Sequence, residues 1–157
     1  MTFSQLEAAL YQWASTNSAI QVIFADENGI RPIDKYITIK IIISTPIGHP
    51  HIGNTDDNGD REILQNENFT VELNSYYRGS NDDLQVLKDS LKKDAVMQSL
   101  ADDGIVIRDE NGSITDLSVL LDDITIEKRY LYEIRFSFCK TVSENVSYIG
   151  TVDIQQI

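Results

Sequence analysis

The stretch that most constrains the fold runs from residue 124 to residue 138 and reads ITIEKRYLYEIRFSF. Every even position except Lys128 carries Ile, Tyr or Phe, and every odd position except Leu131 is polar. Such alternation puts the two sets of side chains on opposite faces of a strand. The stretch therefore predicts one unusually long β-strand, with a buried apolar face and a wetter face carrying charges of both signs. The charges on that wetter face are Glu127, Arg129, Glu133 and Arg135.

The rest of the chain divides into further strands and two helices. Strand patterns predict strands over residues 17–26, 36–45, 62–77 and 147–157, with a short strand and turn at 104–114, a connecting segment at 115–123 and a turn at 140–146. Helical spacing predicts helices over 3–16, with Phe3, Leu6, Leu10 and Trp13 on one face, and over 80–104. We expect an α+β fold over residues 1–157, in which two helices pack on one face of a mostly antiparallel β-sheet as a single domain.

Residues 46–60 read PIGHPHIGNTDDNGD and combine prolines, glycines and acids. This composition predicts an exposed loop between the strands at 36–45 and 62–77. Two strands joined in this way form an antiparallel hairpin. The sequence therefore predicts a long protruding β-hairpin loop.

The charge balance narrows the class of protein. Thirteen Lys and Arg against 25 Asp and Glu give a net charge of −12, which argues against a dedicated nucleic-acid binder. A single cysteine, Cys139, excludes an internal disulfide and fits a reducing cytosol. No apolar run approaches the roughly 20 residues of a membrane span, and the first residues do not resemble a secretory signal. We expect no membrane association.

Candidate catalytic groups are few. The two histidines, His49 and His51, lie near Asp56 and Asp57 in the sequence. The chain has no third His and only a single Cys, so a common zinc ligand set is not completed. It has no P-loop, no GxGxxG and no GxSxG motif. We therefore expect no catalytic residue, cofactor or metal. The alternatives left open are a metal-dependent enzyme that uses His49 and His51, and a ligand-binding module whose pocket a sequence cannot show.

Several segments, taken in order, resemble the neck or tail terminator family of tailed bacteriophages. They are YITIKIII, FTVELNSYYRGSNDDLQVLKDSL, LADDGIVI, ITDLSVLLDDITIEKRYLYEIRFSF and IGTVDIQQI. The resemblance implies a non-enzymatic virion protein, assembled in the host cytoplasm, that forms a ring, usually sixfold, at the head-proximal end of the tail. Its partners would be further copies of itself, the tail tube protein and the head connector, with DNA passing through the lumen unbound. Another connector-completion, tail-tube or baseplate subunit is the alternative within the virion.

Such a ring needs subunit contacts, and the sequence offers candidates. Charges on a strand face can set register and partner choice, and Tyr and Arg are enriched at interfaces. For Arg129 and Arg135, pairing with a neighbouring subunit and cross-strand pairing within the sheet both remain open. The predicted interface residues are Arg129, Arg135, Glu127, Glu133, Tyr76, Arg78, His49, His51, Asp56 and Asp57.

Overall fold

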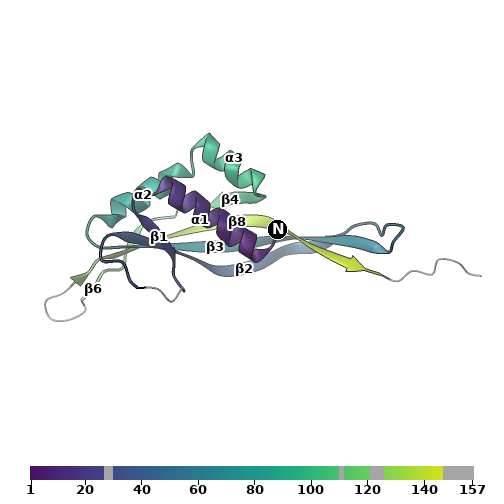
Figure 1. Cartoon of the computed structure of the whole chain (residues 1–157), viewed down its shortest axis with the longest axis horizontal. Helices are drawn as coiled ribbons and strands as arrows, with labels where there is room; N and C mark the ends of the chain where they lie inside the picture. Colours follow the sequence, from purple (N-terminus) through teal and green to yellow (C-terminus); the bar gives the residue numbers. More distant parts are fainter. Residues whose placement is uncertain (27–29, 110–111, 121–125, 147–157) are drawn as a thin grey trace, which may run out of the picture.

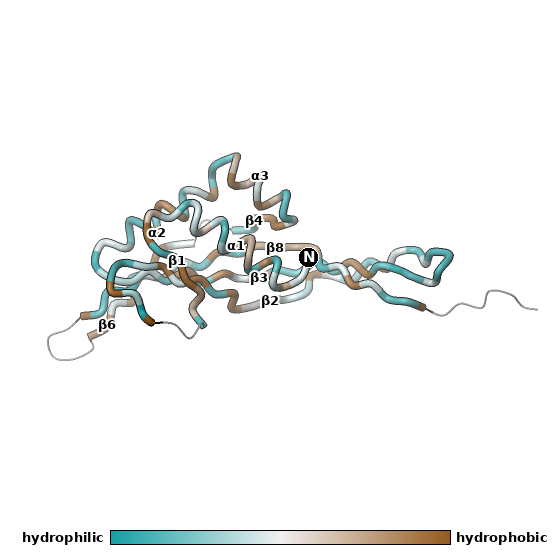
Figure 2. The backbone as a smooth tube through the Cα atoms, in the orientation of Figure 1, coloured by the Kyte–Doolittle hydropathy of each residue, from teal (hydrophilic) through white to brown (hydrophobic). Residues whose placement is uncertain are grey.

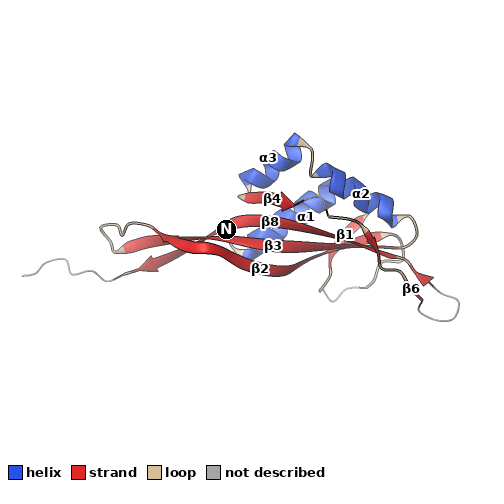
Figure 3. Cartoon of the chain, turned by 180° about the vertical axis from the view of Figure 1, so that it is seen from behind, coloured by secondary structure: helices blue, strands red, loops and turns tan. Residues whose placement is uncertain are grey.

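The computed structural model describes residues 1–26, 30–109, 112–120 and 126–146. Within these residues, three helices pack on one face of a large, mostly antiparallel sheet (Figure 1; Figure 3 shows the opposite view). The predicted α+β class is confirmed. The number of helices is not two, because the second predicted helix is divided.

The main sheet has the strand order β1-β2-β3-β8-β4. These strands are β1 (Gln21–Phe24), β2 (Tyr36–Ile52), β3 (Asp60–Tyr76), β8 (Arg129–Asn145) and β4 (Ile105–Asp109). The β1–β2 pair is parallel and the other pairs are antiparallel. The short strand β5 (Thr115–Asp116) adds to β8, while β6 (Val119–Leu120) and β7 (Ile126–Glu127) pair separately. The long strands β3 and β8 form the centre of the sheet.

Helix α1 (Phe3–Asn17) begins with a capping box. The Thr2 hydroxyl accepts a hydrogen bond from the Gln5 amide, and the Gln5 side chain accepts one from the Thr2 amide. Three of the four residues predicted to share its apolar face, Leu6, Leu10 and Trp13, are buried. Phe3 was wrongly included: its side chain is 51% exposed, because it lies in the first turn.

The predicted helix over 80–104 is two helices, α2 (Ser80–Ser90) and α3 (Asp94–Asp102). The break is local: Leu91 and Lys92 donate to carbonyls three residues back, and Lys93 is extended. The change of direction lets both Leu91 and Leu100 reach the core. In a single straight helix with 3.6 residues per turn, positions 91 and 100 would point to opposite sides, so the two leucines could not both face the core.

Residues 46–52, predicted as loop, are strand: β2 continues to Ile52, and only 53–59 connect it to β3. Pro46 and Pro50 are tolerated because this part of β2 lies at an edge of the sheet. A register shift between Ile47 and His51, with Gly48 at φ 66°, absorbs the irregularity. The prediction from composition therefore made the loop between β2 and β3 too long.

The strand predicted from the opening stretch starts later and ends later than expected. β8 begins at Arg129, after Lys128 separates it from β7, and it runs through the predicted turn at 140–146 as far as Asn145. Ile126 was expected in the core and is instead 58% exposed on β7. Ile124 and the predicted last strand at 147–157 lie outside the described residues.

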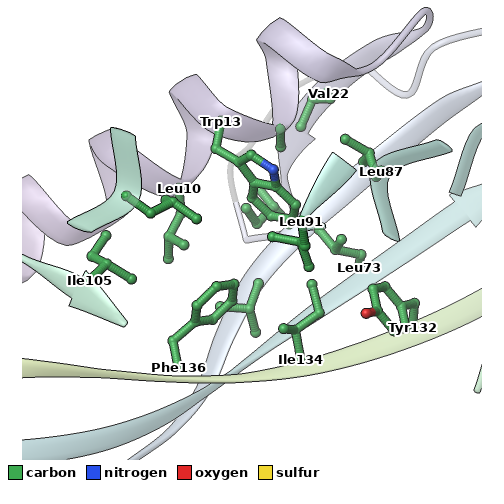
Figure 4. Close-up of a cluster of buried hydrophobic side chains, with 14 of the residues drawn as sticks. Leu10, Trp13, Val22, Leu73, Leu87, Leu91, Ile105, Tyr132, Ile134 and Phe136 are labelled. Carbon is green, nitrogen blue, oxygen red and sulfur yellow. The ribbon is translucent and has the colours of Figure 1, made fainter. Parts of the chain in front are cut away.

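The core lies between the sheet and the helices (Figure 4). The rings of Phe69 and Phe136 stack across β3 and β8 with centroids 5.4 Å apart. Trp13 Nε1 donates to Ser90 Oγ at 3.1 Å, which ties α1 to α2 and satisfies the one polar atom of the buried indole. The fully buried side chains on β8 are Tyr132, Ile134 and Phe136.

Beyond the core, β2, β3 and β8 continue together as a three-stranded extension made of residues 44–52, 60–68 and 139–145. No helix covers it in Figures 1 and 3. Asp60 pairs with Asn145 at its end, and the Val146 amide donates to the Gly59 carbonyl. The molecule is therefore elongated, with a packed body and a bare extension.

A candidate assembly surface on the open face of the sheet

The helices cover one face of the sheet, and no helix among the described residues covers the other, here called the open face (Figure 3). Because side chains alternate along a strand, the residues between the buried positions of β2, β3 and β8 point to this face. The open face is formed by Tyr36, Thr38, Lys40, Thr70, Glu72, Asn74, Tyr76, Arg129, Leu131, Glu133 and Arg135. Five of the ten predicted interface residues lie on or beside it.

At one end of the open face, aromatic rings and guanidinium groups pack together. Tyr76 stacks on Tyr36 with ring centroids 4.6 Å apart. The Arg31 and Arg129 guanidinium carbons lie 5.3 Å and 5.8 Å from the centre of the Tyr76 ring. These are cation–π distances. Tyr76 is thus held mainly by its own chain.

Arg31 and Glu127 form an ion pair beside this cluster. The hydrogen bond that Arg31 donates to Glu127, followed by attraction to Tyr36, raises the pKa of Arg31 against the opposing effect of burial. Burial raises the pKa of Tyr36. Glu127 therefore has a partner inside the chain, joining the segment before β2 to β7.

Arg129 is also engaged within its own sheet. Its Nε donates to Asn74 Oδ1 at 2.9 Å, and its guanidinium lies 3.9 Å from Glu72. Asn74 is buried, so this bond satisfies a side-chain acceptor that solvent does not reach. Cross-strand pairing, one of the two alternatives open for this residue, is present.

Glu133 and Arg135 differ from Arg129. Both are exposed, and neither forms an ion pair with another described residue. They border a shallow depression of about 390 Å³ between the sheet and the segment after β4. The lining residues are Ile42, Thr70, Asp109, Gly112, Ser113, Thr115, Leu131, Glu133 and Arg135. An acid and a base that form no ion pair with other described residues can receive a complementary pair from another protein.

The remaining predicted residues lie elsewhere. Arg78 is exposed in the turn between β3 and α2, where Gly79 adopts a left-handed conformation. His49 and His51 are exposed on the extension part of β2. Asp56 accepts hydrogen bonds from the Asn58 and Asp60 amides at 2.9 Å, which shapes the turn, and Asp57 is exposed beside it. These four residues are at the extension and do not join the open-face cluster.

No group of three or more His, Cys, Asp or Glu with metal-binding geometry occurs among the described residues. In the same part of the chain, no helix is long and apolar enough to cross a membrane. Another hollow of about 400 Å³ separates α1 from α3 beside Trp13 and Val96.

Sequence reasoning missed four members of the open-face network: Arg31, Lys40, Glu72 and Asn74. Lys40 lies directly opposite Glu72, which in turn lies opposite Glu133. The alternation within residues 62–77 places Glu72 and Asn74 on the polar face, so their side of the sheet was readable. The strand register that makes them neighbours of Arg129 was not.

Comparison with known proteins gives one assignment. A family model described as phage neck terminator protein matches residues 4–157. A search of curated proteins finds no match.

Proposed function

The chain belongs to the phage neck terminator family, a family of structural virion proteins of the tail and neck, and from that membership we propose a specific role. Copies of the chain assemble into a ring of six at the head-proximal end of the tail. The ring stops growth of the tail tube and presents a surface to the head connector. Assembly takes place in the host cytoplasm, and the protein stays in the virion.

The observation that carries this proposal is a pair of exposed charges on the open face that form no ion pair with another described residue. A ring needs a heterologous contact, in which one surface of a subunit meets a different surface of the next. Glu133 and Arg135 are exposed beside a depression, and neither forms an ion pair with another described residue, although Asp109 lies opposite Arg135 in the strand register. Charges arranged in this way set orientation and partner choice more than affinity.

We rank the candidate contact residues by the partners that they have within the chain. Arg129, Tyr76 and Glu127 have partners inside the chain, so their contribution to a subunit contact is indirect: they hold the open face in shape. Glu133 and Arg135 are the residues we assign to direct contact. Arg78 is exposed and stands second.

The net charge of −12 supports a conduit. DNA that passes through the ring carries one negative charge per about 1.7 Å of helix axis. An acidic protein repels this charge and does not retain the DNA by nonspecific binding. We propose that the lumen takes no specific DNA contact.

The test combines purified protein with tail tubes that lack this subunit. Negative-stain images are expected to show a ring at one end of each tube, with tube length no longer increasing. Arg135→Glu is expected to reduce the capped fraction at least tenfold. Lys92→Glu, which makes the same charge change in the exposed turn between α2 and α3, away from the open face, is the matched control and is expected to cap normally.

Two outcomes would overturn the proposal. Protein that leaves tube ends bare and tube growth unrestricted is not a terminator. A label found along the tube or at the baseplate, with none at the head-proximal end, would assign the chain to a different structural role in the tail.

A further inference from the structure

Among the described residues, no strand pairs with one edge of β8 along the extension. On the body, β4 covers this edge and its pairing ends where Ile105 meets Phe138. From Cys139 to Asn145, β8 pairs only with β3 on its other side, among the described residues. Unpaired N–H and C=O groups on a regular edge are a template for another strand.

The two edges of the extension are not equivalent. On the β2 side, Pro46 and Pro50 remove backbone donors, and a register shift lies between Ile47 and His51. Prolines and bulges are the devices that protect an edge from pairing. Over residues 139–145, β8 has no proline, glycine or register shift. This edge is therefore both free and unprotected.

The free stretch is complementary to itself. Residues 139–145 read CKTVSEN and are centred on Val142. If a second copy runs antiparallel about that centre, Val142 meets Val142, and Lys140 meets Glu144 twice. Opposite charges at directly opposed positions stabilise a strand pair. We propose that two copies of this chain pair through residues 139–145 of β8 about a two-fold axis at Val142.

The face of the extension on the helix side fits this pairing. Val142 lies opposite Ile63, which lies opposite Ile52, so three aliphatic side chains cross the extension in line. Val142 and Ile52 are 45% and 52% exposed. Figure 2 shows hydrophobic stretches interspersed with hydrophilic ones along this part of the chain. In the pair, the aliphatic line continues into the second copy and loses exposure to water.

Charges on the same face alternate across the pair. Arg61 bonds to Glu144 at 2.8 Å within one copy, and Lys140 lies 3.6 Å from Glu67. Setting Glu144 beside the second copy's Lys140 continues the order positive, negative, positive, negative. The isolated extension already holds both residues on the required face, so pairing needs no rearrangement of β8.

The pair is a state of the free protein and does not depend on the proposed ring. A two-fold contact joins the same surface on both copies, whereas a ring is built from a heterologous contact. One strand pair buries less surface than the roughly 1,000 Å² of a stable interface. The dimer is therefore expected to dissociate on dilution.

The test is the mass of the full chain over a concentration series at physiological ionic strength, by analytical ultracentrifugation. The mass is expected to rise from 17.7 kDa toward twice that value. Lys140→Glu alone and Glu144→Lys alone place like charges opposite each other twice, and each is expected to weaken dimerisation about tenfold. The double variant restores both opposed pairs and is expected to dimerise like the parent.

This double variant separates contact between copies from stability of the extension. Each single change also removes an ion pair inside the chain, with Glu67 or with Arg61, and the double variant does not restore those. Recovery of the dimer therefore reports the contact between copies. A double variant no better than the singles, or a parent chain that stays monomeric at all concentrations, would overturn the proposal.

Disulfide cross-linking locates the axis. In a Cys139→Ser background, Val142→Cys places two thiols directly opposite each other, within the Cα separation of about 4.4–6.8 Å that a disulfide accepts. Lys140→Cys in the same background is the control, because its self-pairs are offset by four residues, about 13 Å. Cross-linking of the first variant alone is expected. Cross-linking of both, or of neither, or only when tail tubes are present, would contradict the two-fold pair in free protein.

Discussion

Glu72 on β3 lies directly opposite Glu133 on β8, so two carboxylates meet on the open face of the sheet. Like charges at directly opposed positions destabilise a strand pair. Arg129, 3.9 Å away, compensates Glu72, and Lys40, opposite Glu72 on β2, is paired with Asp26 at 3.0 Å. Glu133 forms no ion pair with another described residue. The arrangement costs the isolated subunit stability and leaves an acidic group available for a partner.

Glu133→Lys is therefore expected to stabilise the isolated chain by about 0.5 kcal/mol, because it turns a repulsive pair into an attractive one. Urea unfolding at low ionic strength measures the change. Glu133→Gln removes the repulsion without adding attraction and is expected to give a smaller gain. The same Glu133→Lys protein is expected to cap tail tubes poorly. A loss of stability would show that Glu133 is already neutralised within the chain.

Arg129→Ala and Arg135→Ala form a matched pair of changes on one strand. Arg129 donates to the buried Asn74, so its loss leaves an unsatisfied acceptor and is expected to cost about 1–2 kcal/mol of unfolding free energy. Arg135 is exposed, and its loss is expected to change stability by less than about 0.5 kcal/mol. Capping of tubes is expected to fall with Arg135→Ala. Equal destabilisation by the two changes would contradict the division of roles.

The elements that sequence predicted well are those whose signal is a period. The buried positions Tyr132, Ile134 and Phe136 follow from alternation, and Leu6, Leu10 and Trp13 follow from helical spacing. Both patterns depend only on the periodicity of the element itself and on one of its faces packing against a core.

The elements that sequence reasoning misplaced depend on neighbours in space. Residues 46–52 became strand because β3 offers hydrogen-bond partners, which outweighs the turn chemistry of Pro46 and Gly48. Residues 140–145, predicted as a turn, are strand for the same reason, because they pair with β3. In the candidate site, the polar character of the open face was predictable from the sequence. The pairing of Arg129 with Asn74 was not, because the two residues are 55 positions apart and meet only through the register of β3 and β8.

Gly112 is expected to resist substitution because it lies close to β8. A Cβ at this position would come within 2.6 Å of the Glu133 carbonyl oxygen. Overpacking against backbone of this kind costs about 1–3 kcal/mol, so Gly112→Ala is expected to lower the urea midpoint. Ser113→Ala, at the next and exposed position, is the control and is expected to be near neutral. An unchanged midpoint for Gly112→Ala would show that the segment after β4 moves away from β8 at little cost.

Tyr36 is expected to make stability fall at high pH. Burial raises the pKa of its hydroxyl above the ordinary value of 10.0, against the opposing attraction of Arg31. The folded chain then keeps a proton that the unfolded chain releases, so the contribution is complete below pH 10 and is lost as the pH rises from 10 through the folded pKa. Tyr36→Phe cannot ionise, and its urea midpoint is expected to fall less than that of the parent between about pH 9 and about pH 11. Below about pH 9 the difference between the two proteins should not vary with pH. Parallel loss of stability in both proteins across the alkaline range would show that Tyr36 does not contribute to it.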